Sequence, residues 1–396
     1  MKVFKGATIF TGTGKKIENG ILIVEGTQIS FVGTENKVEI PSDAEIIELQ
    51  GKYIFPGLID PHTHVGIDEE GVGEIGDDYN EMADPVTPYL RAIDGIYPQD
   101  QGFEDALSGG ITTVGVTPGS ANVIGGEIAA LHTVGRTVEE KLVRAPVGMK
   151  FAMGENPKRV YGKQQKTPYT RMAVAYLIRQ ALYKAIDYAN KWDIYNNKAS
   201  ENAHASATPP DHDLGLENLS KVLDTSIKAR FHAHRIDDIM TAIRIGEEFG
   251  LNMTIEHATE GHKIADILSK KQIPCVVGPV ISTRAKVELK DRSPKTAAIL
   301  VQHGVPVSIM TDHPVVPIQH LRDSIMIAIK NGLPWEKALY ANTLQAAKIL
   351  GIEDLTGSLE KGKMADFVIT DKENIFSIET NILQVYVEGT IALDNM

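Results

Sequence analysis

The chain has 396 residues, of which 42% are hydrophobic and 23% charged, the composition of a globular protein with room for one large domain and a small one. Its 40 basic and 52 acidic residues give a formal net charge of −12. This balance argues against binding to nucleic acid or an anionic membrane, because phosphate recognition requires clustered cations. The single cysteine, Cys275, excludes an intramolecular disulfide and is typical of a reducing compartment. With no secretory leader and no apolar run of about 18 residues visible, we expect a cytoplasmic protein.

Residues 1–54 and 351–396 share a pattern of short apolar strands separated by glycine-containing turns. The first segment contains VFKGATIF, GILIVEGTQISFVG and AEIIELQGKYIF, and the second contains GSLEKGKMADFVITD and VYVEGTIAL. Neither segment is long enough for a comfortable core of its own. We therefore predict that the two termini combine into one small β-sandwich beside a central domain.

Residues 55–350 alternate between apolar strands and helical stretches. Strands are expected at 55–62, 111–118, 147–154, 228–234, 252–258, 274–280 and 306–312, and helices at 170–193, 237–249, 262–271, 294–303 and 318–331. Several strands are apolar on both faces, which is typical of a parallel sheet covered by helices. The alternation predicts an α/β fold of the (β/α)8 barrel type. Seven strands are clear, and the eighth is expected within 127–135.

The polar, proline-containing segment 194–213 (IYNNKASENAHASATPPDHD) has no helical or strand period. We expect a flexible loop there, and a loop at the C-terminal face of a barrel can act as a lid. Its two histidines, His204 and His212, are expected to be solvent-exposed rather than metal ligands.

Histidine and aspartate side chains stand at the carboxyl ends of four predicted strands. In chain order they are His62 and His64, His232 and His234, His257, and Asp312. In a parallel barrel these ends meet at one face, where such enzymes keep their active sites. Imidazole and carboxylate groups gathered there suit Zn²⁺ or another divalent first-row metal. Because four strand ends agree, the sequence predicts a metal site.

The motif PGLIDPHTH, preceded by a β-rich segment, resembles the opening of the amidohydrolase superfamily, close to its imidazolonepropionase-related and prolidase-like members. The segments FHAHR, IEHATEGH and IMTDHP are similar to the remaining metal-binding strands of that family. ANTLQAAKILGIEDLTGSLEKGKMADFVITD resembles the helix and returning β-segment with which those enzymes end. The resemblance covers nearly the whole chain and implies a hydrolase with one or two divalent metal ions in a distorted barrel, plus a composite β-domain.

The resemblance also implies a ligand set. His62 and His64 would hold the more buried metal together with Asp312. His232 and His257 would hold the second metal.

Other side chains are candidates for contact with the substrate, and the resemblance implies two of them. His234 and Arg235 would face it, and Arg235 either pairs with a substrate carboxylate or forms an ordinary salt bridge at the rim. Arg284, just after a strand in GPVISTRAKVEL, is a further candidate for substrate binding. His262 follows His257 closely, although a helix start capped by Thr259 would also explain that stretch.

The ligand that would bridge two metals has two candidates. Many members of the family use a lysine carboxylated by CO₂ on the fourth strand, and Lys150 in VGMKFAMGENPK stands at that position. Others use a glutamate, and Glu155 lies where this strand ends. A lysine in an apolar strand needs a special reason, since burying its charge is costly; carboxylation or a salt bridge to Glu155 would supply one. Glu155 is slightly favoured because it needs no modification, and Lys150 stays open.

These parts predict hydrolysis of a C–N bond in a small amide, imide or dipeptide-like molecule. A divalent metal supplies a water that ionises near pH 7, and Asp312 would take its proton and pass it to the leaving nitrogen. The alternatives are a one-metal deaminase of a heterocycle, an N-acyl deacetylase and a barrel used only for assembly. A barrel used only for assembly would not need all of the predicted metal ligands, and their presence argues against this alternative. The partner is thus a small molecule, and a homo-oligomer is compatible with the family.

Overall fold

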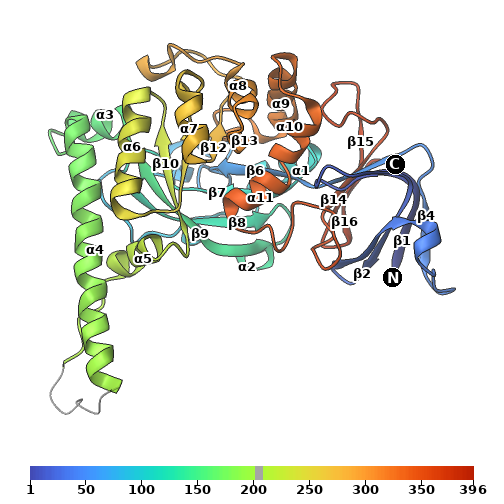
Figure 1. Ribbon diagram of the computed structural model, residues 1–396, viewed down its shortest axis with the longest axis horizontal. Coiled ribbons are helices and arrows are strands. Elements are labelled where there is room, and N and C mark those ends of the chain that lie inside the picture. The colour runs from blue at the N-terminus through green and yellow to red at the C-terminus, as the bar shows by residue number, and fades with distance from the viewer. Residues whose placement is uncertain (201–207) are drawn as a thin grey trace.

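The structure is a computed structural model that describes residues 1–200 and 208–396. It contains a barrel, a separate β-sheet at one side, and one long helix, α4 (Arg171–Ser200), that extends beyond the barrel at the other (Figure 1). Within the described residues, no helix is both long and apolar enough to cross a membrane.

Both termini contribute to the separate sheet. Its strands are β1 (Lys2–Phe10), β2 (Lys16–Glu25), β3 (Gln28–Thr34), β4 (Glu45–Glu48), β5 (Tyr53–Pro56), β14 (Phe367–Thr370), β15 (Ile382–Val387) and β16 (Thr390–Asp394). Strand β5 pairs with β14 in antiparallel register, so the first and last parts of the chain are hydrogen-bonded to each other. The rings of Phe4, Phe367 and Tyr386 pack with centroids 4.5 to 5.0 Å apart in its core. The predicted composite β-domain is confirmed.

The barrel sheet has eight strands in sequence order. They are β6 (Leu58–Thr63), β7 (Ile111–Val116), β8 (Ile124–His132), β9 (Leu142–Ala152), β10 (Lys228–Ala233), β11 (Met253–His257), β12 (Cys275–Val277) and β13 (Val307–Ile309). The eighth strand expected within 127–135 is β8, but it runs antiparallel to β7 and β9. The reason is the short connection 117–123, because a parallel crossover needs a dozen or more residues. The α/β barrel is confirmed with this distortion.

Asn342 spans the seam between β6 and β13, the two ends of the barrel sheet. Its side-chain Nδ2 donates to the Ile309 carbonyl at 2.6 Å and the Ile59 carbonyl at 3.3 Å, and its own carbonyl accepts from Ile59 N at 2.8 Å. The hydrogen bonds of this one residue thus connect β6 to β13, where neighbouring strands would otherwise be joined by backbone hydrogen bonds.

Helices cover the outside of the barrel (Figure 1). Besides α4 they are α1 (Gln101–Ser108), α2 (Val138–Lys141), α3 (Glu155–Lys163), α5 (Leu214–Leu223), α6 (Ile236–Phe249), α7 (Ala265–Lys271), α8 (Thr296–Gln302), α9 (Leu321–Lys330), α10 (Trp335–Ala341) and α11 (Leu344–Leu350). Helix α6 is representative: Ile239, Ala242, Ile243 and Gly246 form one buried stripe, and the helix ends at Gly250, whose φ of +65° is left-handed.

The loop predicted at 194–213 is only partly correct. Residues 194–200 continue α4, because the helix already has its apolar contacts and nothing in IYNNKAS breaks it. His204 lies outside the described residues. His212 is exposed, packs on Trp192 and contacts Glu217 Oε1 at 2.7 Å.

Gly57 joins the terminal sheet to the barrel. Its backbone N–H donates to the Asp366 carbonyl at 2.9 Å, and a Cβ at this position would lie 2.0 Å from Thr112 Oγ1. Only glycine allows this close approach of β6 to β7. The Pro-Gly before the histidine motif is therefore a packing requirement that sets where β6 begins.

Candidate metal centre

His62 and Asp312 meet at the top of the barrel because the strand ends that carry them are tied together. The Asp60 carboxylate accepts the Thr311 backbone N–H at 3.0 Å and the Thr311 hydroxyl at 2.6 Å. His62 Nε2 then lies 3.4 Å from Asp312 Oδ1, and His64 Nε2 lies 3.5 Å from the same oxygen. The three side chains predicted to share one metal are thus together.

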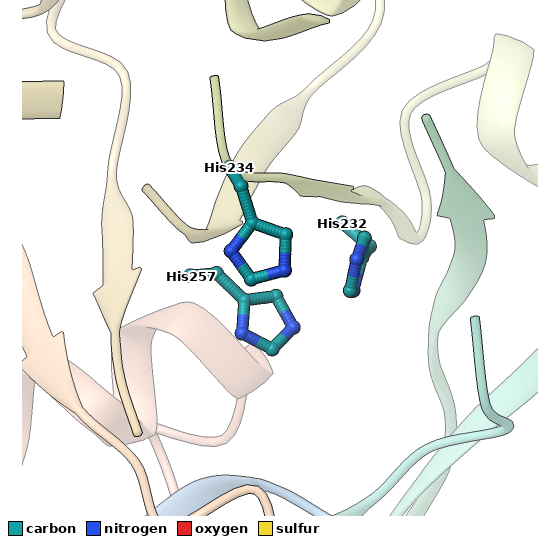
Figure 2. A group of neighbouring side chains, drawn as sticks. All are labelled: His232, His234 and His257. Carbon is teal, nitrogen blue, oxygen red and sulfur yellow. The ribbon is translucent and has the colours of Figure 1, made fainter. Parts of the chain in front are cut away.

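Three further histidines form a second cluster beside the first (Figure 2). The ring centroids of His232, His234 and His257 are 4.2 to 4.7 Å apart, and all three side chains are buried. Nδ1 of His257 contacts the Gly278 carbonyl at 2.9 Å, and Nδ1 of His234 contacts Thr259 Oγ1 at 2.7 Å. These contacts orient both rings and leave Nε2 facing the cluster.

Two of these residues have an unusual backbone. His257 has φ +71° and Asp312 has φ +57°, both in the left-handed region that non-glycine residues rarely adopt. Such strain persists at functional sites when the surrounding structure enforces it. Here both residues follow or end a strand, and the left-handed turn is where the chain leaves the barrel wall.

The donor atoms fit a divalent metal. His62, His257 and Asp312 form one group, and His232, His234 and His257 form another, with ligand atoms within 4.8 Å of one another in each. Both ring nitrogens of His232 and Nε2 of His234 and His257 are buried without a hydrogen-bond partner. Buried polar atoms normally have a partner, so a cation bound between these nitrogens is a direct explanation for them.

The protonation of the site suits metal binding. Burial lowers the pKa of His257 to about 3 and that of His232 and His234 well below the usual range, so these imidazoles are neutral at pH 7. Burial alone would raise the pKa of Asp312, but His257, His62 and His64 hold it well below the usual range. The site therefore presents neutral nitrogens and one carboxylate.

The two candidates for a bridging ligand are placed differently. Lys150 on β9 is buried and its Nζ lies 3.2 Å from His62 Nε2. Glu155 starts α3, where its backbone N–H donates to Glu288 Oε1 at 2.5 Å. Lys150 forms no ion pair with a carboxylate among residues 1–200 and 208–396, so the salt bridge to Glu155 is not formed.

A cavity of about 620 Å³ opens above the two clusters. It is lined by His64, Asp68, Tyr79, Ser120, Asn156, Arg159, His232, His234, His257, Pro279, Ser282, Thr283, Ala285, Lys286, Leu289, Asp312, Pro314 and Val315. Of the four residues predicted to bind substrate, His234 lines it. Arg235 pairs with Asp237 at 3.0 Å, Arg284 donates to the Lys290 carbonyl at 2.9 Å, and His262 contacts Thr296 Oγ1 at 3.0 Å, all away from the lining.

Sequence reasoning missed two sets of residues. Arg159 and Lys286 line the cavity, but they lie on a helix and a loop whose path the sequence does not give. Arg230 and Glu256 form a fully buried ion pair below the histidines at 2.6 Å. A signal for this pair was present, since each is a charged residue inside an otherwise apolar strand and stands close before a predicted ligand.

Comparisons with known proteins agree with this site. A sequence profile described as "Amidohydrolase family" matches residues 53–392. The chain is 30% identical to amidohydrolase tasK of Hapsidospora irregularis over 95% of its own length, but spans only 40% of that relative. It is 25% identical to an imidazolonepropionase of Acinetobacter baumannii, covering 93% of this chain and 91% of the relative.

Solved structures give the same result. The crystal structure of an amidohydrolase from Thermotoga maritima MSB8 is 42% identical, covers 100% of both chains and superposes with a TM-score of 0.93. A prolidase solved with N-methylphosphonate-L-proline shares the fold, with 18% identity and a TM-score of 0.63 over both complete chains. The chain therefore belongs to the amidohydrolase family, in its imidazolonepropionase-related branch, and is a hydrolase acting on carbon–nitrogen bonds.

Proposed function

We propose that the chain hydrolyses an amide, imide or dipeptide-like C–N bond of a small molecule with metal-activated water. The observation that carries this proposal is the set of buried, unpartnered histidine nitrogens that face one cavity beside an ionised aspartate. A metal-free site would leave these nitrogens desolvated without compensation.

The residues that would hold metal form two groups. His62, His64 and Asp312 would hold one ion, since Nε2 of the two histidines lies 3.4 and 3.5 Å from Asp312 Oδ1, and His232 and His257 would hold a second. Zn²⁺ is the first candidate because imidazole and carboxylate ligands suit it. When bound, such an ion lowers the pKa of water towards 7 and polarises the substrate carbonyl.

Asp312 is the general base in this proposal. Its carboxylate is 13% exposed, ionised, and borders the cavity, so it can accept a proton from the attacking water and return it to the leaving nitrogen. His234 lies on the same wall, and its Nε2 can donate to or accept from the substrate.

Lys150 rather than Glu155 is our choice for the bridging ligand. The buried Nζ of Lys150 touches His62, whereas α3 turns Asn156 and Arg159 towards the cavity one and four residues after Glu155. Desolvation lowers the pKa of Lys150 to about 8, so a larger share of this side chain is the neutral amine at pH 7 than for an exposed lysine. That amine would add to the carbon of dissolved CO₂ to form an N–C bond, and the displaced proton would go to solvent.

Two cations on one side of the cavity point to a substrate with an anionic group. Lys286 Nζ lies 3.1 Å from Asn156 Oδ1 and 3.4 Å from Glu288 Oε2, and its charge reaches all three histidines of the second cluster. Arg159 stands one turn from Asn156 on α3 and lines the same cavity. A substrate carboxylate bound beside Lys286 and Arg159 would offset the repulsion between these two cations.

A heterocycle deaminase is the second candidate function. It is favoured by the fact that His62, His257 and Asp312 alone form a complete group for one metal ion. An N-acyl deacetylase uses the same parts as the hydrolase. A cytoplasmic location and a homo-oligomer stay predictions.

The test is a substrate panel assayed with metal-loaded protein, with and without a chelator. N-acyl amino acids, dipeptides and cyclic imides test hydrolysis, and heterocyclic amines test deamination through ammonia release. Metal-dependent cleavage of an amide, stronger for carboxylates than for their methyl esters, supports the proposal. Ammonia release from heterocycles alone favours the deaminase, and turnover that survives complete metal removal contradicts both.

A further inference from the structure

One contact of His62 is not explained by metal binding alone. Its Nδ1 lies 2.8 Å from Glu256 Oε2, and the exposed fractions of the two side chains are 1% and 0%. Glu256 is on β11, next to the candidate ligand His257, but its carboxylate belongs to neither group of candidate metal ligands.

Glu256 is itself held from the other side by Arg230. The guanidinium donates Nε to Oε1 at 2.7 Å and Nη2 to Oε2 at 2.6 Å, and Nη2 also reaches the Pro61 carbonyl at 2.9 Å. The Thr254 hydroxyl donates to Oε1 at 2.5 Å. With four donors, counting His62, the carboxylate has no freedom to turn.

The chemistry of a carboxylate decides which nitrogen of His62 carries the proton. The Glu256 carboxylate accepts two N–H groups of the Arg230 guanidinium and the Thr254 hydroxyl, and an ionised carboxylate only accepts hydrogen bonds. The proton of His62 must therefore reside on Nδ1. Nε2 then carries the lone pair on the side of Asp312 and Lys150, and Lys150 Nζ at 3.2 Å can donate to it.

We propose that Glu256, locked by Arg230, is a positioning residue that fixes the tautomer and ring orientation of His62 so that Nε2 is open to the metal. The proposal rests on the proposed role of His62 as a metal ligand. It adds that the buried ion pair is part of the metal centre, although neither residue touches substrate.

The first experiment measures Zn²⁺ affinity by competition with a chelating indicator in wild type, Glu256→Gln and Asp366→Asn. A carboxamide can offer either an oxygen or an NH₂ group to Nδ1, so Glu256→Gln no longer selects the tautomer. We expect its affinity to fall about 10- to 100-fold, the usual cost of losing the hydrogen-bond partner of a metal ligand. Asp366 is the matched control: it is another buried carboxylate that contacts a histidine, His132 Nε2 at 3.2 Å, but at the barrel–sheet junction. Asp366→Asn is expected to keep wild-type affinity.

Because Glu256→Gln leaves Arg230 buried without its counter-charge, folding is monitored by circular dichroism and a second variant is prepared. Arg230→Met/Glu256→Gln removes both charges and is expected to fold while still binding Zn²⁺ more weakly than wild type. Wild-type affinity in either folded variant overturns the positioning role and leaves the proposed function intact.

The second experiment needs no metal and no variant of the pair. Two-bond ¹H–¹⁵N correlations in ¹⁵N-histidine-labelled, metal-free protein report the tautomer of each ring, and His62 is assigned from its absence in His62→Ala. We expect a proton on Nδ1, and a proton on Nε2 overturns the proposal. If instead the tautomer is as expected but wild type binds no Zn²⁺, the proposed function fails by itself.

Discussion

Among residues 1–200 and 208–396, two histidine–carboxylate pairs that are buried on both sides behave in opposite ways. His62 contacts Glu256 at 2.8 Å inside the barrel, and His132 contacts Asp366 at 3.2 Å where β8 meets the terminal sheet. All four side chains are less than 5% exposed. Distance and burial therefore do not distinguish the two pairs.

The third group at each carboxylate makes the difference. Arg230 neutralises Glu256, whereas Asp366 receives neutral donors, the Thr356 hydroxyl at 2.6 Å and the Glu388 backbone N–H at 2.9 Å. Burial and the charge of Lys150 lower the pKa of His62. Burial also opposes protonation of His132, but the charge and the hydrogen bond of Asp366, together with the charge of Glu388, outweigh burial and raise the pKa of His132.

A buried histidine–carboxylate contact can therefore either prepare a metal ligand or form a structural ion pair. A neutral imidazole with a free nitrogen can bind a metal, whereas an imidazole whose pKa is raised by a carboxylate without a cationic partner is biased towards an ion pair. The first pair prepares a functional site. The second ties β8 to Asp366, the residue whose carbonyl also accepts the N–H of Gly57.

The largest difference between the two pairs is expected when His62 and His132 are each replaced by alanine. We expect His62→Ala to lose bound metal and reduce hydrolysis by about 1,000-fold or more, because a metal supplies several kcal/mol of transition-state stabilisation. His132→Ala should keep both. Metal content by mass spectrometry and initial rates give the answer, and a metal-replete, active His62→Ala would contradict the assignment.

Asp366→Asn tests the structural pair. Removing one partner of a buried pair leaves the other uncompensated, so we expect the free energy of unfolding to fall by about 3 kcal/mol, with unchanged metal content. Urea titration followed by fluorescence measures this. A variant as stable as wild type would show that the junction does not depend on the pair.

The pH dependence of stability sharpens the contrast further. Because the pKa of His132 is raised on folding, its contribution is fully present below the unfolded value of about 6.5 and is lost as pH rises through the folded pKa. The pKa of Asp366 is lowered on folding, so its contribution is lost as pH falls below the unfolded value of about 3.9 and through the folded pKa. The stability difference between wild type and His132→Gln should therefore be largest between these limits and shrink towards pH 9. A difference that grows with pH would contradict the raised pKa of His132.

The smallest effect is expected from a substitution of Arg284, in the loop after β12. Arg284 binds backbone carbonyls of its own loop and faces neither pair nor the cavity lining. Arg284→Ala should change the free energy of unfolding by less than about 0.5 kcal/mol and leave the KM for a substrate with a carboxylate unchanged. In contrast, Lys286→Met should raise that KM. Equal effects of the two variants would remove the proposed anion-binding side of the cavity.

The sequence predicted those features that depend on local pattern. Strand ends bearing His62, His64, His232, His257 and Asp312 were identified because hydrophobic runs show where strands stop. The antiparallel direction of β8 was missed because it follows from the length of a connection rather than from periodicity. The family resemblance predicts Arg235 near the substrate, and position just after a strand end suggests Arg284 and His262. In the structure they contact Asp237, backbone carbonyls and Thr296 instead, and none of them lines the cavity.

The pairing of the buried charged residues could not be predicted from the sequence, for a different reason. Lys150, Arg230 and Glu256 stand out as charged residues in apolar strands, yet which of them pair depends on the register of β9, β10 and β11. In that register Arg230 on β10 lies beside Lys150 on β9, and it stands two residues before His232 on its own strand. Such pairing between neighbouring strands cannot be read from any one strand.

The most direct test of the metal centre is an anomalous-difference map from crystals of the Zn²⁺-loaded protein, recorded at the zinc edge. We predict density between His62 and Asp312 and, with Lys150 carboxylated, a second peak between His232 and His257. Fully loaded, active protein without a peak at either cluster would contradict the account.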